Sequence, residues 1–402
     1  MPAVAPTNLA WPFFDEGHRA LVVQLEAWIA DELPTLLHGS EDSLDACYAC
    51  VQRLVRSLGR AGLLRCCVPQ AQGGLRESFD VRSVALARET LARASGLADF
   101  ALAMQGLGSA PVTLFGNAAQ QAALLPGVAE GRLITAFALS EPDAGSDVAA
   151  MSATATRLPA GGWRLDGVKT WISNAGLADH YVVFARSGEA PGARGISAFM
   201  VDARTPGLDA SERIPVIAPH PLGLVKLNDC RVGDDALLGE AGGGFKIAMG
   251  TLDSFRTTVG AAALGFGRRA LDEALQRVHA RRMFGKTLAD FQMTQQKIGQ
   301  MAVALDASAL MVYRAGWTKD VQRVRVTREA SMAKLYATEA AQKVIDDAVQ
   351  LFGGLGVVQG SVVERLYREI RALRIYEGAS EVLELIVGAR TLQDALTPRQ
   401  NA

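Results

Sequence analysis

One glutamate of this 402-residue chain stands between an aromatic residue and a glycine, near the end of a helix-rich sequence. Glu377 lies between Tyr376 and Gly378 in the stretch RIYEGASE (374–381). Glycine lets a backbone or a ligand approach closely, so this carboxylate could lie beside a bound molecule. The alternative is a loop acid that faces solvent, because glutamate is rarely buried.

Two segments near the middle of the chain could bind a flat ligand. The segment AFALSEPDAGSD (136–147) carries serine hydroxyls and a glycine, so it can present N–H and O–H donors to a heteroaromatic ring or a carbonyl group. The segment KTWISNAG (169–176) sets a tryptophan beside a β-branched residue and near a hydroxyl, which suits the side of an aromatic ring system. The alternatives are an ordinary polar turn and a tryptophan that fills the core of its own domain.

Glycines and cations mark three further segments. RRMFGK (281–286) places three cations around Phe284 and Gly285, which could meet a pyrophosphate or form a solvated helix end. QLFGGLG (350–356) ends an amphipathic helix; its glycines would admit a phosphate, although the helix dipole disfavours an anion there. LGEAGGGF (238–245) indicates a hinge or a turn between domains.

Other catalytic and metal-binding motifs are missing. The sequence has no GxSxG nucleophile elbow, no HExxH, no GxxxxGK[ST] loop and no GxGxxG after a predicted strand. Cys47 and Cys50 form a CxxC, but Cys66 and Cys67 are adjacent and Cys230 stands alone, which does not give the spacing of a zinc site. We therefore expect buried, reduced thiols on helices and no metal.

The composition is that of a soluble globular protein. Hydrophobic residues make up 49% and charged residues 21%, and a net charge of −1 gives no electrostatic reason to bind nucleic acid or an anionic membrane. No apolar stretch reaches the roughly 20 residues of a membrane-spanning helix. The first residues carry no basic leader, so we expect a cytoplasmic protein.

Hydrophobic periodicity divides the chain into three zones. Residues 1–130 and 241–402 show helical spacing, whereas 131–240 contains β-branched and aromatic runs. Within the middle zone, Asp166 and Gly167 form the dipeptide of a hairpin turn. The predicted order is a helical domain, a β domain and a second helical domain, an α+β fold.

The segments LSEPDAGSD, KTWISN, RRMFGK followed by FQ, QLFGGLG and IYEGASE together resemble the acyl-CoA dehydrogenase family, in the family's order and spacing over nearly the whole chain. The resemblance implies an N-terminal helical domain (1–130), a middle β-barrel-like domain (131–240) and a C-terminal four-helix bundle (241–402). It also implies FAD bound between the middle and C-terminal domains.

The resemblance assigns cofactor-binding residues by position. Those expected around the flavin are Phe137, Leu139, Ser140, Gly145, Ser146, Trp171, Ile172 and Ser173. Those expected to reach the pyrophosphate and adenosine across a subunit boundary are Arg281, Phe284, Gln292, Gln350, Gly353 and Gly354, with Ser380 and Glu381 also near the cofactor. Sharing a cofactor in this way implies a homodimer or a homotetramer.

The resemblance makes Glu377 the catalytic base that removes the proton α to a thioester, while the hydride from the β carbon goes to the flavin. The substrate-binding residues it implies are Ser146, Asp253, Arg256, Tyr376 and Gly378, with Arg256 shaping the pocket floor. In some members the base stands instead on an earlier helix, where this chain has Phe255, which cannot accept a proton. Ala379 and Ser173 depart from the threonines common at their positions.

The function implied is FAD-dependent oxidation of an acyl-CoA to the 2-enoyl-CoA in fatty acid metabolism, with electrons passed to an electron-transferring flavoprotein. One alternative is a dehydrogenase of an acyl group held by a carrier protein. Another is a relative with altered chemistry, such as a desulfinase-like or a nucleic-acid-associated flavoprotein; the retained Glu377 and the near-neutral charge argue against it.

Overall fold

The structure is a computed structural model that describes residues 7–40 and 42–396. The chain forms two compact units, each assembled from separate parts of the sequence. The helical unit comprises Met1–Val23, Val81–Asp99 and Asp253–Ala402, and the sheet unit comprises Gln24–Asp80 and Phe100–Leu252.

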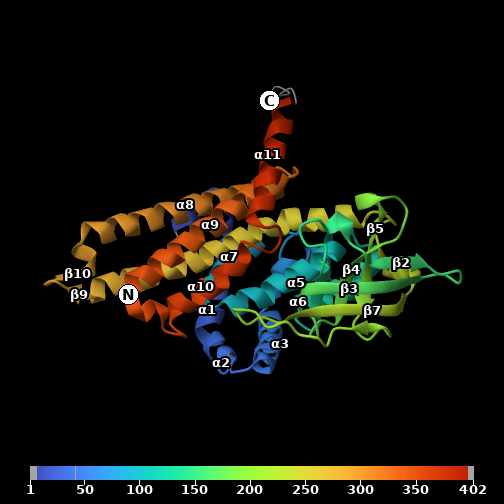
Figure 1. Cartoon of the computed structure of the whole chain (residues 1–402), viewed down its shortest axis with the longest axis horizontal. Helices are drawn as coiled ribbons and strands as arrows, with labels where there is room; N and C mark the ends of the chain where they lie inside the picture. Colours follow the sequence, from blue (N-terminus) through green and yellow to red (C-terminus); the bar gives the residue numbers. More distant parts are fainter. Residues whose placement is uncertain (1–6, 41, 397–402) are drawn as a thin grey trace. The chain divides into compact units, whose positions relative to one another are not determined.

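Long helices build the helical unit (Figure 1). A short hairpin of β9 and β10 separates α7 from α8. The elements are α4 (Val81–Ala94), α8 (Gln292–Asp320), α9 (Thr327–Phe352), α10 (Val362–Leu373), α11 (Ser380–Leu396), β9 (Arg282–Met283) and β10 (Lys286–Thr287). Three helices contribute residues to both units: α1 (Glu16–Asp31), α5 (Gly96–Phe115) and α7 (Gly244–Ala280).

Small residues let the helices of this unit pack closely. Alanines such as Ala262, Ala333 and Ala341 are fully buried in its core. A Cβ added at Gly265 of α7 would lie 2.3 Å from the backbone oxygen of Glu89 on α4, so only glycine fits there. The α4 helix is therefore held tightly against α7.

The sheet unit contains α2 (Leu33–Leu37), α3 (Leu44–Arg60) and α6 (Ala118–Ala129) beside one sheet. Within the described residues that sheet has eight strands in the order β6-β7-β3-β2-β4-β5-β8, with β1 parallel to β4. The strands are β1 (Thr135–Ala138), β2 (Thr154–Arg157), β3 (Trp163–Ser173), β4 (His180–Arg186), β5 (Ile196–Asp202), β6 (Leu208–Asp209), β7 (Leu222–Val232) and β8 (Leu237–Leu238). The sequence-based order of helices, strands and helices is confirmed.

The predicted hairpin turn at Asp166-Gly167 is wrong. Both residues lie inside the continuous strand β3, where the pairing with β7 shifts register between Leu165 and Gly167. Gly167 is needed because a Cβ there would come within 2.7 Å of the Cα of Ala153, and because its φ is +145°. The glycine thus marks a bulge with a close backbone approach, and β2 connects to β3 through residues 158–162.

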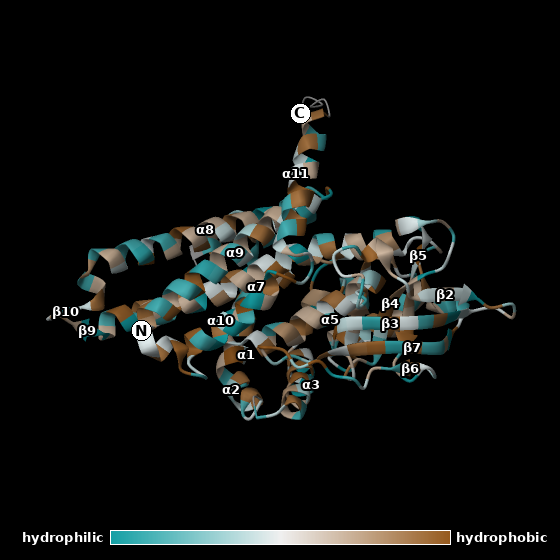
Figure 2. Cartoon of the chain, viewed as in Figure 1, coloured by the Kyte–Doolittle hydropathy of each residue, from teal (hydrophilic) through white to brown (hydrophobic). Residues whose placement is uncertain are grey.

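The five cysteines are all buried and unbridged, although Cys230 lies on a strand and not on a helix. Among the described residues, no helix has the length and apolar character needed to cross a membrane. Figure 2 shows hydrophilic residues interrupting each of the long helices α7, α8 and α9.

Candidate active site around Glu377

Glu377 lies in the connection between α10 and α11, in a strained backbone conformation. Its φ is +54° and that of Gly378 is +104°. The left-handed region costs a residue other than glycine roughly 1–2 kcal/mol, so surrounding contacts must hold it. Two buried cations supply these contacts. Arg256 Nε donates to the carbonyl of Glu377 at 3.1 Å, and Lys334 Nζ donates to the carbonyl of Gly378 at 2.7 Å.

The start of α11 is fixed by a carboxylate of α9. Ser380 Oγ donates to Glu339 Oε1 at 2.5 Å, and Arg374 Nε donates to the same oxygen at 2.7 Å. These bonds tie both ends of the 374–380 connection to one helix. Glu377 is therefore presented by a connection with three separate anchors.

The carboxyl group of Glu377 does not face solvent in the way that a loop acid would. Its Oε2 atom is buried and has no hydrogen-bond partner among the described residues. Desolvation raises the pKa of Glu377, against the opposing charges of Arg88, Lys334 and Arg256. A desolvated carboxylate with an unfilled acceptor site is suited to take a proton from a bound molecule.

The structure brings Arg256 and Asp253 together beside Glu377. Arg256 Nη1 lies 3.3 Å from Asp253 Oδ1, and the hydroxyl of Thr327 donates to the other oxygen of Asp253. Arg256 thus holds the backbone of the predicted base. Phe255, at the alternative position of the base, is completely buried.

Three charged residues near Glu377 were missed from the sequence: Arg88, Asp99 and Lys334. Lys334 is fully buried on α9, and burial lowers its pKa to about 8. The sequence does contain a sign of Lys334. It falls at helical spacing from Ala330, Ala337 and Ala341, which places a cation on an otherwise apolar helix face.

In the sheet unit, an ion pair joins the two segments predicted to bind the flavin. Lys169 Nζ donates to Glu141 Oε1 at 2.8 Å and to the carbonyl of Leu139 at 3.1 Å. Glu141 also accepts the amides of Ser152 and Ala153 at 2.6 and 2.9 Å. Desolvation alone would raise the pKa of Glu141, but these hydrogen bonds and the charge of Lys169 lower it.

Trp171 is presented outward by an irregularity in β3. The pairing of β3 with β7 shifts between Lys169 and Ile172, and Trp171 has a φ of +58° and a side chain that is 59% exposed. The core position belongs to Trp163, which is buried. Trp171 therefore does not fill the core of its own domain.

The other residues predicted around the flavin lie on β1, in the loop that follows it, and beside this tryptophan on β3. The amide of Thr170 donates to the carbonyl of Ser140 at 3.0 Å, which joins the two segments directly. Leu139 and Ile172 are buried, Phe137, Ser140 and Ser173 are partly exposed, and Gly145 and Ser146 are exposed. An outward aromatic ring beside serine hydroxyls and an open loop fits a flat heteroaromatic ligand.

A second group of predicted cofactor residues gathers at one end of the helical bundle. Arg277 of α7 donates to the carbonyl of Phe352 at the end of α9, which brings the β9–β10 hairpin and the glycines after α9 to the same end. Phe284 has a φ of +49° and is 85% exposed. Nothing lies within 4 Å of a Cβ built at Gly353 or Gly354.

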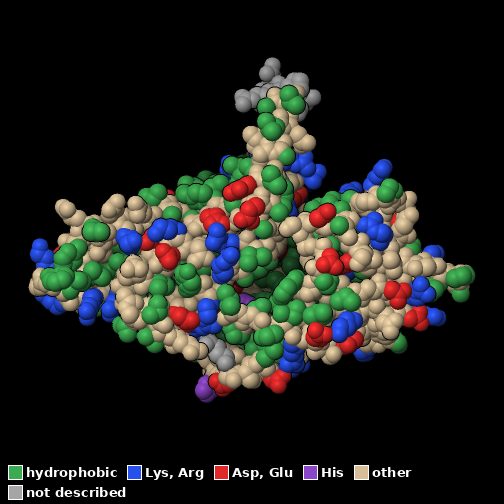
Figure 3. Space-filling view, viewed as in Figure 1, with side chains coloured by type: hydrophobic (Ala, Val, Ile, Leu, Met, Phe, Trp, Pro, Cys, Tyr) green, Lys and Arg blue, Asp and Glu red, His purple; other side chains and the backbone are tan. Residues whose placement is uncertain are grey.

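The exposed members of this group are Arg281, Phe284, Gln292, Gln350, Gly353 and Gly354. Figure 3 shows lysine and arginine side chains at the hairpin end. Open glycines, an exposed ring and nearby cations fit a phosphate-bearing aromatic ligand.

Within the helical unit, the residues around Glu377 and the residues at the β9–β10 hairpin lie at different positions along α7. Arg256, which binds the backbone of Glu377, and Ala280, where α7 ends, are 24 residues apart in one helix. At about 1.5 Å per residue this is roughly 36 Å. Ser380, which is buried, and Glu381, which is exposed, lie with Glu377 and not with the hairpin.

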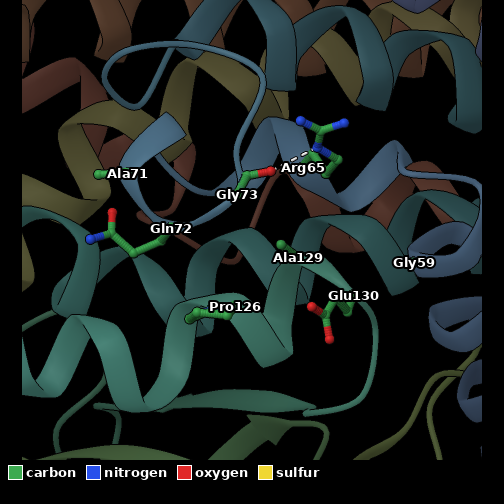
Figure 4. A pocket seen from close by; sticks show the side chains of 8 residues that line it. All are labelled: Gly59, Arg65, Ala71, Gln72, Gly73, Pro126, Ala129 and Glu130. Carbon is green, nitrogen blue, oxygen red and sulfur yellow. Dashed lines mark hydrogen bonds between the residues drawn. The ribbon is translucent and has the colours of Figure 1, made fainter.

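One cavity of the sheet unit is separate from all these residues. It has a volume of about 410 Å³ and is lined by Gly59, Arg65, Ala71, Gln72, Gly73, Pro126, Ala129 and Glu130 (Figure 4). It contains none of the predicted site residues.

The sequence profiles of three domains of one family match this chain in order. The acyl-CoA dehydrogenase N-terminal domain matches residues 15–132, the middle domain residues 136–230 and the C-terminal domain residues 242–392. The chain belongs to the acyl-CoA dehydrogenase family, whose members are FAD-dependent oxidoreductases acting on acyl-CoA.

Individual relatives agree with this assignment. The short-chain specific acyl-CoA dehydrogenase of human mitochondria is 38% identical over 342 residues, which cover 84% of this chain and 82% of the relative. The caffeyl-CoA reductase-Etf complex subunit CarC of Acetobacterium woodii is 36% identical over 350 residues, covering 85% and 90% of the two chains.

Solved structures of the family superpose well on this chain. Butyryl-CoA dehydrogenase from Megasphaera elsdenii gives a TM-score of 0.87 at 31% identity, over 94% of this chain and 99% of the other. An acyl-CoA dehydrogenase from Bacillus anthracis complexed with FAD gives 0.87 at 30% identity, over 95% and 68%.

Proposed function

We propose that this protein oxidises an acyl-CoA thioester to the 2-enoyl-CoA and passes the electrons to an electron-transferring flavoprotein. The observation that carries the proposal is the buried Oε2 atom of Glu377, which has no hydrogen-bond partner in the described part of the chain. Glu377 would use this oxygen to accept the proton from the carbon α to the thioester.

The neighbours of Glu377 prepare it for this step. The backbone N–H of Glu377 would donate to the thioester oxygen and stabilise negative charge as the proton leaves. The carbonyl groups of Glu377 and Gly378 are held by Arg256 and Lys334, so the connection stays in place during the transfer. Gly378 leaves space for the thioester, and Tyr376 would form a wall of the acyl pocket.

FAD, when bound, supplies the acceptor for the hydride from the β carbon. Trp171, Ser140 and Ser173 would hold its ring, and the remaining residues expected to contact it from the sheet unit are Phe137, Leu139, Gly145, Ser146 and Ile172. The outward direction of Trp171 and the exposure of Gly145 and Ser146 support this role, whereas Leu139 and Ile172 are buried beside them along the chain.

We also propose that a second copy of the chain completes the cofactor site, as a homodimer or a homotetramer. Within one helical unit, the hairpin with Phe284 and the connection with Glu377 are separated by most of the length of α7. The exposed leucines Leu385 and Leu392 of α11 support assembly, since such side chains are covered in many oligomers.

The electron acceptor is proposed from the relatives. CarC of Acetobacterium woodii is named as a subunit of a complex with Etf, which supports a flavoprotein partner for this chain as well.

The experiment that tests the function is an anaerobic titration of the purified protein, after its visible spectrum has shown bound flavin. Acyl-CoAs of increasing chain length are added, beginning with butyryl-CoA, and bleaching of the flavin is followed. We expect bleaching by one class of chain length. A flavin that no CoA thioester bleaches, but that a carrier-bound acyl group does, would contradict the choice of substrate.

A further inference from the structure

The loop of residues 142–151, which includes Gly145 and Ser146, is closed at its base. It connects Glu141, which follows β1, to Ser152, which precedes β2. Glu141 Oε2 accepts hydrogen bonds from the amide and the hydroxyl of Ser152, at 2.6 and 2.8 Å. One buried carboxylate therefore joins the two ends of the 142–151 loop.

The tip of this loop is open. Asp143, Gly145, Ser146 and Asp147 are all exposed. Nothing lies within 4 Å of a Cβ built at Gly145. An exposed tip can meet a ligand, but its position depends on how the backbone on either side of it is held.

Arg186 holds the backbone that follows the tip. Its Nη2 donates to the carbonyl of Ala149 at 2.6 Å, and its Nε donates to the carbonyl of Met151 at 3.3 Å. Its Nη1 donates to the carbonyl of Gly192, in the connection between β4 and β5, at 3.1 Å. A single guanidinium thus joins the 142–151 loop to a second loop.

The sheet fixes Arg186 itself. Arg186 is the last residue of β4, which lies between β2 and β5, and it pairs with Ile196 of β5. Its amide donates to the carbonyl of Ala153 at 2.7 Å. The position of the guanidinium is therefore set by the sheet and not by the loops that it holds.

The chemistry of arginine suits this task. Its guanidinium carries five N–H donors in one rigid plane, so one side chain can hold three carbonyl groups. All three of these partners are backbone carbonyls, so Arg186 fixes the path of the chain. Because the Arg186 side chain is partly exposed, loss of these hydrogen bonds should loosen the loops and leave the core of the sheet unit closed.

We propose that Arg186 is a positioning residue for the flavin and the acyl-CoA. By holding the backbone of the 142–151 loop, it keeps Gly145 and Ser146 where these molecules meet them. A loop that is already held in its binding conformation binds more tightly, because less conformational freedom is lost when the ligand arrives. The proposal deepens the proposed function and rests on it, because the contacts of Gly145 and Ser146 with the flavin are part of that function.

The first test uses the full-length, flavin-loaded protein and the variant Arg186→Met, which keeps an apolar stem and removes the donors. Release of flavin after dilution, followed by its fluorescence, should be about tenfold faster than in the wild type. Hydrogen exchange of the amides of residues 143–150, followed by mass spectrometry, should also be about tenfold faster. The amides of β3 and β4 should keep their wild-type rates.

An exposed arginine of the same sheet provides the matched control. Arg231 of β7 has its Nε 2.9 Å from Asp229 Oδ1, and both side chains are exposed. Arg231→Met should leave flavin release and exchange in residues 143–150 at wild-type rates. Arg186→Lys should give intermediate rates, because an ammonium keeps the charge but cannot reach all three carbonyl groups at once.

Steady-state kinetics separate positioning from a merely structural role. In Arg186→Met the KM for acyl-CoA should rise several-fold while kcat, at saturating flavin, stays within about twofold of the wild type. This split is expected because Glu377 belongs to the helical unit and its anchors do not include Arg186. A merely structural role would instead raise exchange throughout the sheet unit and leave KM unchanged.

The outcomes distinguish failure of this proposal from failure of the proposed function. Wild-type rates of flavin release and of exchange in residues 143–150 of Arg186→Met would overturn the role of Arg186, as would the structural pattern just described. A protein whose flavin no acyl thioester reduces would sink the proposed function, while release and exchange would still report on Arg186. If Arg186→Met does not fold, wild-type rates in Arg186→Lys would overturn the proposal.

Discussion

Glu141 in the sheet unit and Glu377 in the helical unit are both desolvated glutamates, but their partners differ. Glu141 accepts hydrogen bonds from Lys169, Ser152 and Ala153 on both of its oxygens, and its pKa is lowered. Glu377 has a buried oxygen without a partner among the described residues, and its pKa is raised. Burial by itself raises the pKa of both carboxyl groups, so the difference comes from their hydrogen-bond partners.

The difference shows how a buried carboxylate can serve either to hold the structure together or to accept a proton. Where every acceptor site is filled, the carboxylate is fixed in its ionised form and joins two segments of chain. Where cations hold the backbone carbonyls and leave the carboxylate oxygen unfilled, the group keeps its capacity to take a proton. Three variants would break or sharpen this contrast.

The largest effect is expected from Glu377→Gln, which keeps the shape of the side chain and removes its basicity. Turnover should fall by about 10²–10⁴-fold or more, the usual contribution of a general base, while the flavin content stays that of the wild type. The measurement is steady-state dehydrogenation with an artificial electron acceptor. Glu384→Gln, an exposed change on α11, is the control; turnover of Glu377→Gln at the wild-type rate would refute the assignment of the base.

The next largest effect concerns Lys169→Met, which leaves Glu141 buried without its cation. Breaking a buried ion pair costs about 3–5 kcal/mol, so the free energy of unfolding in urea should drop by that amount and flavin should be lost more readily. Lys226→Met disrupts the exposed pair with Glu212 on the same sheet and should leave the stability almost unchanged. Equal losses in the two variants would contradict the scaffold role.

The smallest effect is a pH dependence at Lys334, whose pKa is lowered to about 8 by burial. Between pH 8 and the ordinary value of 10.5, the folded chain has released a proton that the unfolded chain still binds, so stability rises with pH. Relative to Lys334→Met, the wild type should gain on the order of 3 kcal/mol across this window. A difference that is flat between pH 7 and 10.5 would show that Lys334 is not desolvated.

Much of the fold could be predicted from the sequence because hydrophobic periodicity is a local signal. The order of helical and β zones follows from it, whereas the role of Glu377 is predicted from the resemblance to the family and not from its neighbours alone. The division of the chain into its two units could not be predicted in the same way, since Val81–Asp99 packs with distant helices such as α8, which begins at Gln292. The hairpin prediction at Asp166-Gly167 is wrong because a turn dipeptide and a glycine required by close approach of another segment, here Ala153, look alike in one sequence.

The charged neighbours of Glu377 could not be assigned a role in advance. Arg88 and Lys334 lie on helix faces that are otherwise apolar, but nothing local states which residue they meet. Their partners, Asp99 and the carbonyl of Gly378, come from other helices or connections. Contacts of this kind depend on tertiary packing, which periodicity does not encode.

Six residues other than glycine in the described part of the chain have a left-handed backbone, and three of them are Trp171, Phe284 and Glu377. Each would gain roughly 1–2 kcal/mol if glycine or another backbone conformation relieved it. Selection for heat resistance alone, in a laboratory evolution experiment, would therefore reward changes at these positions first and remove the predicted flavin contacts and the base together. A screen that combines heating with flavin retention would protect two of them, and only a screen for turnover would protect Glu377.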